Sequence, residues 1–532
     1  MPRVLAPAAA LVALGVALAA CAPEPADERV GVEVAAAPPA DAIAVVGGDV
    51  DTAIADALGA LPEIIDADLE ETGVPGLAVA VVHDGEVIYA EGYGVKTAGG
   101  EDAVDAETVF QIASVSKAIS STAVTAAINE GALTWETPVS SLLPDFALAD
   151  PYVTDNATVA DYFSHRSGLA TGAGDDLEDL GYERTYVLDH LQLLPLDPFR
   201  STYHYSNYGI TVGAEAAAAA VGLPWEDAVD ELVYEPLGMT HTSSRYDDFL
   251  ARENRADIHA FVDGGFEPEF ARDPDPQAPA GGVSSNVLDL AVWMNTVLAG
   301  GEHDGRQIFD PDALIAATTG EMVSGHPMDN TWRTSLYGYG FNTESAAGGR
   351  TVIGHSGGFV LGAATNIRMI PSLDLGIVTL SNGAPYGLPE AVNAQFLDLV
   401  QYGEVTRDWV DDYRGAVASL TAPVGDLVDV APPSDPQPSG AASEYTGTYA
   451  NDYFGELTVS EAAEGLAVAM GPGKDYVIEL APWDGDVFSF APTGENAPEG
   501  SLSSATFGRG GDGVATLTLD FFDHQGLGTW RR

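Results

Sequence analysis

The sequence predicts an α+β domain followed by a small antiparallel β-barrel domain. Three observations support this fold class. Strand-like segments stand at both ends of the stretch 50–410, with helical patterns between them. A stretch with several prolines and aspartates, 431–440, follows. Beyond it, short runs with alternating apolar residues are separated by turns that contain glycine.

The first domain begins with a predicted hairpin. Segment 77–90 contains two apolar runs around the turn Asp84-Gly85, which is typical of two paired strands. Apolar residues recur at helical spacing farther on, and strands return over 351–381. The predicted helices cover 115–129, 210–221, 287–298 and 311–318. We therefore expect one sheet built from distant segments, with helices between them.

The C-terminal part has a different pattern. Segment 431–440 cannot hold a helix or a central strand, and we place it in a linker that covers 413–443. From 444 to 532, alternating runs such as 456–459 and 487–490 are separated by turns such as Asp484-Gly485. Short strands with frequent turns predict a small antiparallel barrel or sandwich.

The N-terminus predicts export. Residues 1–20 form an apolar segment behind Arg3 that is too short to span a bilayer comfortably, which is typical of a signal peptide. Leu18-Ala19-Ala20-Cys21 resembles a bacterial lipobox and implies a lipid on Cys21, the single cysteine of the chain. Segment 21–48, rich in alanine, proline and acidic residues, predicts a flexible tether. We expect an exported cell-envelope lipoprotein, membrane-anchored and facing outward or into the periplasm.

The charge balance excludes some partners. The formal net charge is −59, from 80 acidic and 21 basic side chains, which argues against nucleic acid and against adsorption to anionic membranes. Such an acidic excess is typical of proteins that work in high salt, and a solvated acidic surface on an exported protein explains it equally well. The ten histidines are scattered and no H-E-x-x-H motif occurs, so neither a metal site nor another cofactor is predicted.

A candidate nucleophile lies at the start of the first predicted helix. Ser114 stands three residues before Lys117, one of three lysines in the chain, and this spacing puts both side chains on one helix face. The helix N-terminus and burial both favour a neutral lysine, which can accept the serine proton. An isolated motif of this kind is more often an N-cap serine before a solvated lysine. Other motifs must therefore decide whether Ser114 is a nucleophile or an N-cap.

Two downstream segments can complete a catalytic cleft. Tyr205 and Asn207 stand two residues apart in a loop-like run, where a tyrosinate or a hydrogen-bonded phenol could relay protons. The sequence Gly-His-Ser-Gly-Gly at 354–358 follows a strand, and its glycines permit close approach of a substrate backbone. The N–H of Gly358 could stabilise an oxyanion together with that of the nucleophile, and His355 could face the substrate.

In this order, the three motifs resemble those of the penicillin-recognising serine hydrolases. The similarity is to the branch of class C β-lactamases, D-aminopeptidases and related esterases. Segments 164–169 and 279–285 also resemble family signatures, and the resemblance spans roughly residues 50–410. It implies, for a domain over 49–412, an antiparallel sheet flanked by helices plus an all-helical subdomain. The domain over 444–532 resembles the lipocalin-like barrel of some relatives through Tyr-Thr-Gly-Thr-Tyr at 445–449.

The resemblance also implies roles for individual residues. Ser114 corresponds to the acylated nucleophile, Lys117 to its base and Tyr205 to a second proton-transfer group. Asn207 corresponds to a residue that holds substrate or lysine. In the third motif, His355, Gly357 and Gly358 correspond to residues that bind the substrate or stabilise the oxyanion.

One difference from the family pattern concerns the substrate. His355-Ser356-Gly357 stands where β-lactamases and D,D-peptidases usually carry Lys-Thr-Gly. That lysine is a cation that binds a substrate carboxylate, whereas histidine near neutral pH is mostly uncharged. The difference argues against β-lactam hydrolysis and favours a peptidase or an esterase.

The motif at 354–358 also fits G-x-S-x-G, the nucleophile elbow of α/β-hydrolases, with Ser356 as the nucleophile. An elbow must be followed by a helix, but 359–371 has the pattern of a strand. The elbow also needs a downstream histidine, and only His524 is available. We reject this alternative.

We therefore expect a serine hydrolase that forms an acyl-enzyme on Ser114 and hydrolyses an amide or ester in a small-molecule or peptide substrate. One alternative is a penicillin- or peptidoglycan-binding module that acylates slowly or not at all. Another is that the barrel is the functional unit and binds a small lipid or peptide.

Overall fold

The computed structural model describes residues 49–268, 270–327, 333–346, 349–463, 465–511 and 513–532. The expected signal peptide over 1–20, the tether over 21–48 and the lipidation site Cys21 lie outside the described residues. Within the described part of the chain, no helix has the length and apolar character needed to cross a membrane. The described residues, from Asp49 to Arg532, all belong to one compact unit.

The centre of the first domain is an eight-stranded antiparallel sheet. It is built from both ends of the domain, as predicted. Its strands, in spatial order, are β2 (Glu86–Gly94), β1 (Gly76–His83), β14 (Leu375–Ser381), β13 (Ala363–Ile370), β12 (Thr351–Phe359), β11 (Asn342–Ser345), β10 (Ser335–Tyr337) and β9 (Met322–Gly325). Every residue of β14 is buried, because helices cover both faces of the sheet.

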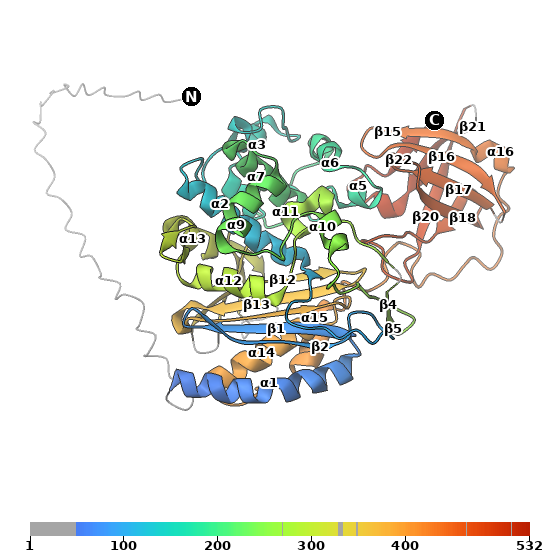
Figure 1. Cartoon of the computed structure of the whole chain (residues 1–532). Helices are drawn as coiled ribbons and strands as arrows, with labels where there is room; N and C mark the ends of the chain where they lie inside the picture. The colour runs from blue at the N-terminus through green and yellow to red at the C-terminus, as the bar shows by residue number, and fades with distance from the viewer. Residues whose placement is uncertain (1–48, 269, 328–332, 347–348, 464, 512) are drawn as a thin grey trace, which may run out of the picture. The chain divides into compact units, whose positions relative to one another are not determined.

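Two layers of helices enclose this sheet (Figure 1). The layer on one face consists of the terminal helices α1 (Val50–Thr72), α14 (Leu388–Tyr402) and α15 (Trp409–Val417). The other layer and the helical subdomain contain α2 (Ser116–Asn129), α3 (Pro151–Asn156), α4 (Val159–Phe163), α5 (Asp175–Asp179), α6 (Arg184–His190), α7 (Asn207–Val221), α8 (Trp225–Val229), α9 (Glu235–Leu237), α10 (Tyr246–Ala251), α11 (Ala278–Gly281), α12 (Val287–Leu298) and α13 (Pro311–Thr318). The four predicted helices correspond to α2, α7, α12 and α13.

Helix α2 lies at the centre of the first domain. All its residues from Ser116 to Ala127 are buried, so it has no polar face. Some of its hydroxyls are satisfied locally: Thr122 and Thr125 donate to backbone carbonyls three residues earlier. A helix with small or apolar residues on every side is stable only when other elements surround it. This burial fixes the position of its N-terminal turn, which carries Ser114.

Strand β12 is longer than the sequence suggested. The motif at 354–358 was expected to follow a strand, but it lies inside β12 and pairs with β13 along its length. The second strand, expected over 359–371, starts later because Gly362 makes the turn with a φ of 135°. No helix follows Ser356, which agrees with our rejection of a nucleophile elbow.

Three two-stranded sheets join loops of the first domain. Among them, β3 (Phe110–Gln111) pairs with β6 (Ser284–Ser285) and ties the segment before the nucleophile to the segment before α12. The other two pairs are β4 (Ala260–Val262) with β5 (Gly265–Glu267) and β7 (Glu302–His303) with β8 (Arg306–Gln307).

The C-terminal domain is a closed antiparallel barrel, which decides between the barrel and the sandwich. Alternate residues face inward along its strands, and Leu457, Val468 and Trp530 are fully buried. The short helix α16 (Ala442–Tyr445) precedes it. Its strands are β15 (Gly447–Asn451), β16 (Gly455–Ala462), β17 (Gly465–Met470), β18 (Tyr476–Asp484), β19 (Val487–Phe490), β20 (Ser503–Gly510), β21 (Gly513–Leu519) and β22 (Thr529–Arg531).

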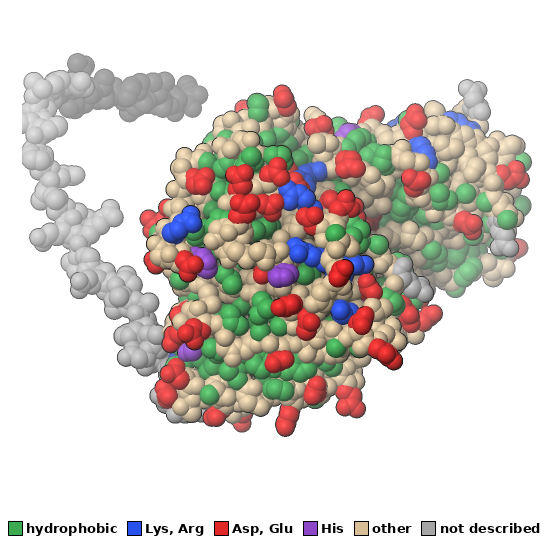
Figure 2. Space-filling model, viewed as in Figure 1, with side chains coloured by type: hydrophobic (Ala, Val, Ile, Leu, Met, Phe, Trp, Pro, Cys, Tyr) green, Lys and Arg blue, Asp and Glu red, His purple; other side chains and the backbone are tan. Residues whose placement is uncertain are grey.

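The surface agrees with the acidic composition. Figure 2 shows carboxylate side chains scattered over the visible face, with basic side chains far fewer. Arginines of the described residues form ion pairs with acidic neighbours; Arg245, for example, pairs with Asp227 and Asp230. Because 80 acidic side chains stand against 21 basic ones, there are too few basic side chains to pair with most of the carboxylates.

Candidate active site

The predicted nucleophile and base are neighbours in the structure. Lys117 Nζ lies 2.8 Å from Ser114 Oγ, 2.8 Å from Asn207 Oδ1 and 2.9 Å from the carbonyl oxygen of Ala280. Three acceptors around one amine fix its position. The alternative of a solvated lysine beside an N-cap serine does not apply, because Lys117 is fully buried.

A tight backbone turn presents the nucleophile. Ser114 lies in a 3-10 turn, Ala113–Val115, and α2 begins directly after it. Ala113 has a φ of 47°, in the left-handed region that non-glycine residues rarely adopt. Strain of this kind persists only where surrounding contacts enforce it, and it is frequent at catalytic sites.

The environment of Lys117 favours the neutral amine. Burial lowers the pKa of its ammonium to about 7, against the opposing influence of the Asp175 and Glu178 carboxylates. A substantial fraction of Lys117 is therefore unprotonated at neutral pH and can accept the proton of Ser114.

Tyr205 is the third side chain of the site, beside Ser114 and Lys117. Its ring centroid lies 4.7 Å from Lys117 Nζ, and Tyr205 and Ser114 line the same cavity. Burial raises the pKa of this phenol well above its usual range, so the group is protonated at neutral pH. Of the two forms considered from the sequence, the protonated phenol fits and the tyrosinate does not.

His165 supports Tyr205, a role that the sequence did not reveal. Its ring packs against the Tyr205 ring at 4.6 Å between centroids, and its Nδ1 accepts a hydrogen bond from the Ser206 N–H. Burial, followed by the charge of Lys117, lowers the pKa of His165 well below its usual range. The only signal was its place in segment 164–169, which resembled a family signature.

His355 lies in a different environment from the one expected. The side chain is buried, with Nε2 2.9 Å from the Tyr337 hydroxyl, and it is absent from the lining of the cavity that contains Ser114. Burial lowers the pKa of His355 to about 3, so its imidazole is neutral. The Tyr337 ring also packs against His165 at 4.9 Å, so His355 contributes to the packing behind Tyr205.

The glycines of the third motif let the strand approach the nucleophile. A Cβ atom on Gly357 would lie 2.4 Å from the Ile112 carbonyl oxygen and 2.9 Å from the Ser114 nitrogen. Thr365 reinforces this contact, since its hydroxyl donates to the same Ile112 carbonyl at 2.7 Å. Gly358, the next residue, lines the cavity beside Ser114.

The resulting cavity has a volume of about 340 Å³. Ser114, Tyr205, Asn207 and Gly358 line it, as the sequence led us to expect for residues of one cleft. It also contains charged residues that we did not predict, from the helical subdomain and from the barrel: Asp175, Glu178, Arg272 and Glu495. In a chain with 80 acidic residues, no local pattern distinguishes these four.

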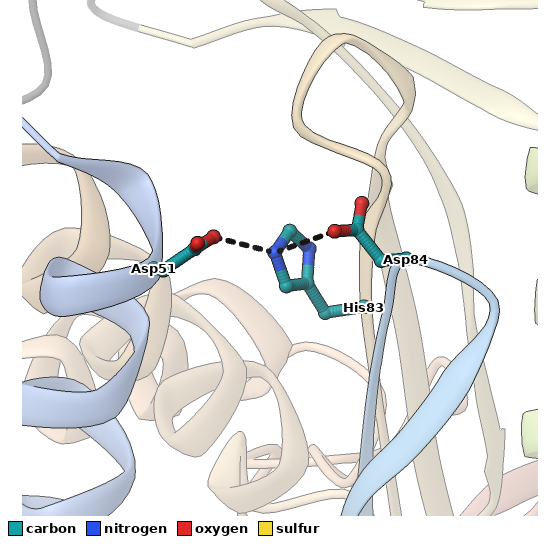
Figure 3. A group of neighbouring side chains, drawn as sticks. All are labelled: Asp51, His83 and Asp84. Atoms are coloured by element: carbon teal, nitrogen blue, oxygen red, sulfur yellow. Dashed lines mark hydrogen bonds and ion pairs between the residues drawn. The ribbon is translucent and has the colours of Figure 1, made fainter.

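One group of three side chains in the described part of the chain could offer metal ligands: Asp51, His83 and Asp84 (Figure 3). Both carboxylates are largely exposed, and His83 Nε2 lies 3.3 Å from Asp51. His83 Nδ1 is 3.1 Å from the Asp374 carbonyl oxygen. These contacts describe a surface ion pair at the turn between β1 and β2, and the group does not line the Ser114 cavity.

Comparison with known protein families identifies the first domain. A family model described as Beta-lactamase matches residues 61–402. The chain belongs to this family. It is a serine hydrolase with the β-lactamase and penicillin-binding-protein fold, and the C-terminal residues 431–528 match a second model, a domain of unknown function.

Members of the family with different names are similar to the chain. It is 28% identical over 451 residues to an unguisins hydrolase of Aspergillus violaceofuscus, covering 77% of each chain. It is 28% identical over 403 residues to penicillin-binding protein 4 of Amycolatopsis lactamdurans, covering 73% of this chain and 96% of the relative. An esterase of Burkholderia gladioli is 30% identical over 231 residues, covering 40% of this chain and 57% of the esterase.

Solved structures of this fold extend over both domains. The octameric penicillin-binding protein homologue from Pyrococcus abyssi superimposes with a TM-score of 0.57 at 20% identity, covering 87% of this chain and 98% of that one. SurE superimposes with a TM-score of 0.54 at 23% identity, covering 91% of this chain and 100% of the SurE chain. At identities of 20% and 23%, the similarity to these structures shows the fold alone.

Proposed function

We propose that the protein forms an acyl-enzyme on Ser114 and releases the acyl group to water, hydrolysing an amide or an ester. One observation carries the proposal: a buried lysine, with a pKa of about 7, lies 2.8 Å from the Ser114 hydroxyl. The protonated phenol of Tyr205, which lines the same cavity, supplies the acid that the leaving group needs.

In acylation, Ser114 is the nucleophile, Lys117 the base and Tyr205 the acid. Ser114 Oγ attacks the substrate carbonyl carbon while its proton moves to the neutral amine of Lys117. The oxygen that becomes negative accepts hydrogen bonds from the backbone N–H groups of Ser114 and Gly358. As the bond to the leaving group breaks, the Tyr205 phenol protonates that group and regains a proton from the Lys117 ammonium.

Deacylation runs the same transfers with water. A water molecule attacks the acyl carbon and gives its proton to the base formed by Tyr205 and Lys117. The Ser114–acyl bond breaks, Ser114 regains a proton, and a carboxylic acid leaves. The free enzyme is restored in its starting protonation state.

The charges of the cavity argue against an anionic substrate. The neutral, buried His355 provides no cation for a substrate carboxylate. Three of the four titratable side chains that line the cavity beside Tyr205 and Asn207 are acidic, and the one basic group, Arg272, is already paired with Glu178 at 2.7 Å. A β-lactam carries a carboxylate, so we propose an esterase or a peptidase of the D-aminopeptidase kind. Two of the relatives are named as a hydrolase and as an esterase.

The test compares wild-type protein, residues 22–532, with Ser114→Ala and Ser356→Ala. A fluorophosphonate probe and p-nitrophenyl butyrate report labelling and turnover. We expect labelling and turnover by the wild type and by Ser356→Ala, and neither by Ser114→Ala. Labelling of Ser114→Ala would contradict the proposal. Labelling of the wild type without turnover would favour the slowly acylating binding module.

We further propose that the chain is exported and anchored to a membrane through Cys21. The apolar segment 1–20 and the lipobox-like Leu18-Ala19-Ala20-Cys21 support this. With an alkyne fatty acid supplied to expressing bacteria, the full chain should become labelled and partition into detergent. Cys21→Ser should remain unlabelled, and equal labelling of both proteins would contradict the anchor.

A further inference from the structure

A second pocket adjoins the catalytic cavity, and we call it the apolar pocket. Its volume is about 220 Å³, and it is lined by β4, by the turn after β12 and by the barrel loop 491–501. Val360 and Pro498 line both the apolar pocket and the cavity that contains Ser114. A substrate at Ser114 that extends past Val360 therefore reaches the apolar pocket.

Most residues that line the apolar pocket have apolar side chains. The ring of Phe261 packs against the rings of Phe266 at 5.2 Å and Tyr386 at 5.4 Å between centroids, which fixes one wall. The larger apolar side chains of the lining are Phe261, Val262, Phe270, Val360, Leu361 and Pro498. Ligand pockets are mostly of this composition, with few polar groups.

The polar groups at the edge of this pocket already have partners within the protein. The exposed Glu499 accepts from the Asp263 N–H at 3.0 Å. The Ser501 hydroxyl donates to the Pro498 carbonyl at 2.6 Å, and the Thr493 carbonyl accepts from the Tyr476 hydroxyl at 3.0 Å. The surface left for a ligand is therefore mainly hydrocarbon.

Exposed apolar side chains gather around the two cavities. Phe270, which lines the apolar pocket, is 44% exposed. Leu420 and Val424, which line the catalytic cavity, are 52% and 37% exposed. Neighbouring exposed apolar groups are typical of binding grooves, because a ligand that covers them removes apolar surface from water.

Hydrogen bonds between the two domains hold the walls of the apolar pocket together. Glu495, in the barrel loop, accepts from the Val360 N–H at 2.6 Å and from the Leu361 N–H at 3.3 Å. One carboxylate thus joins the turn after β12 to the loop that forms the opposite wall. The pocket exists without a ligand, so little reorganisation is needed to fill it.

The apolar pocket lies on the acyl side of the nucleophile. In the proposed mechanism the Tyr205 phenol protonates the leaving group, so the leaving group faces Tyr205. Neither Tyr205 nor Asn207 lines the apolar pocket, which is bordered by Val360, two residues beyond the proposed oxyanion donor Gly358. A group in this pocket therefore belongs to the part of the substrate that stays on Ser114.

We propose that the apolar pocket is a subsite for the acyl group of the substrate and takes an aliphatic chain or an aromatic ring. This rests on the proposed function and adds a substrate class to it: esters or amides of apolar carboxylic acids. The volume of about 220 Å³ is sufficient, because a cavity of about 150 Å³ lined by apolar side chains holds benzene.

The test measures kcat/KM for p-nitrophenyl acetate, butyrate, hexanoate and octanoate, each divided by the rate of spontaneous hydrolysis of the same ester. Burial of one CH₂ group strengthens binding about fourfold, so the wild type should prefer octanoate to butyrate by about 20-fold or more. In a second series, ethyl to octyl butyrates, the chain is in the alcohol, and the rate should change little with its length.

Two variants change the apolar pocket at residues that do not line the catalytic cavity: Phe270→Ser and Leu361→Ser. Each should reduce the ratio of octanoate to butyrate about threefold or more, because apolar wall is lost. Leu250→Ser is the matched control, since Leu250 lies in α10, is 45% exposed and lines neither cavity. Its ratio should equal that of the wild type.

A wild-type ratio near one, or an unchanged ratio in both pocket variants, would overturn the subsite. A preference that follows the alcohol chain would place the pocket on the leaving-group side and overturn the acyl assignment. Turnover of p-nitrophenyl butyrate by the same samples separates the two proposals. Turnover of this ester with a ratio near one overturns the subsite alone, whereas absence of turnover with every ester overturns the hydrolase as well.

Discussion

At the scale of single residues, the chemistry depends on burial of one amine. Lys117 is inside the protein with three polar contacts, and loss of solvation outweighs the two nearby carboxylates that favour its charge. Tyr205 responds to the same burial in the opposite sense, because its charged form is the deprotonated one. One apolar environment thus sets a base and an acid side by side at neutral pH.

This arrangement predicts the pH profile. Because the neutral amine of Lys117 is the active form, kcat/KM for p-nitrophenyl butyrate should rise with pH through about 7 and level off above it. Asp175→Asn removes a charge that stabilises the ammonium, so the rising limb should move to lower pH and the rate at pH 6 should increase roughly twofold or more. Stopped-flow or plate assays from pH 5 to 10 provide the measurement.

Asp189→Asn serves as the control in this series, since that exposed carboxylate is not among the charges acting on Lys117. Its rising limb should coincide with that of the wild type. A wild-type limb near the ordinary lysine pKa, or a shift to higher pH in Asp175→Asn, would disprove the assigned base.

At the scale of secondary-structure elements, strand β12 and the turn before α2 form the site by direct backbone contact. Gly357 is the point of contact, and the turn holds Ala113 in a strained conformation. The segment 279–285 adds a third element: the Ala280 carbonyl holds Lys117, and the Pro279 carbonyl accepts from Ser120 at 2.6 Å. Three elements from distant parts of the chain therefore fix one amine and one hydroxyl.

Gly357→Ala tests this contact. The added methyl group would overlap the Ile112 carbonyl oxygen and the Thr365 hydroxyl and would lie 2.9 Å from the Ser114 nitrogen, so the nucleophile should shift. We expect the rate of fluorophosphonate labelling to fall about 100-fold or more, because such reactions are sensitive to displacements on the order of 1 Å. Calorimetry should show a folded protein.

Gly59→Ala is the matched variant, since Gly59 lies in α1 and an added methyl group there meets no atom within 4 Å. Its labelling rate should equal that of the wild type, and its free energy of unfolding should rise by about 0.5–1 kcal/mol through helix propensity. Normal labelling of Gly357→Ala would show that β12 does not set the position of Ser114.

At the scale of the whole molecule, hydrogen bonds join the two domains around the cleft. The Tyr182 hydroxyl donates to the Phe454 carbonyl at 2.8 Å, and Glu495 accepts from the Val360 N–H at 2.6 Å, two residues after Gly358. Burial raises the pKa of Glu495 to about 8, against the influence of Arg272. The barrel thus contributes a loop to the wall of the catalytic cavity.

The net charge predicts a response to salt. At −59, carboxylates across the surface repel one another, and added salt screens this repulsion. The Tm at pH 7.5 should rise by about 5 °C or more between 0.05 and 1 M NaCl. Near the isoelectric point, where the net charge vanishes, the same salt should change Tm little. A Tm that falls with NaCl at pH 7.5 would show that surface repulsion is not what limits stability.

The sequence by itself determined several elements and the nucleophile motif of this protein. Apolar periodicity is a local property, so it gave the hairpin around Asp84-Gly85 and the helices α2, α7, α12 and α13 close to their observed bounds. The order of three motifs brought Ser114, Lys117, Tyr205 and Asn207 into one hypothesis, and the structure places their side chains together.

The tertiary structure alone decided which other residues surround that group. His355 stands in the third motif but lies behind the site, because packing against Tyr337 and not sequence position fixes its side chain. Asp175, Arg272 and Glu495 reach the cleft from segments far apart, and single charges in so acidic a chain have no local signature. Periodicity is encoded between neighbours in sequence, whereas the lining of a cavity depends on how whole elements and domains pack.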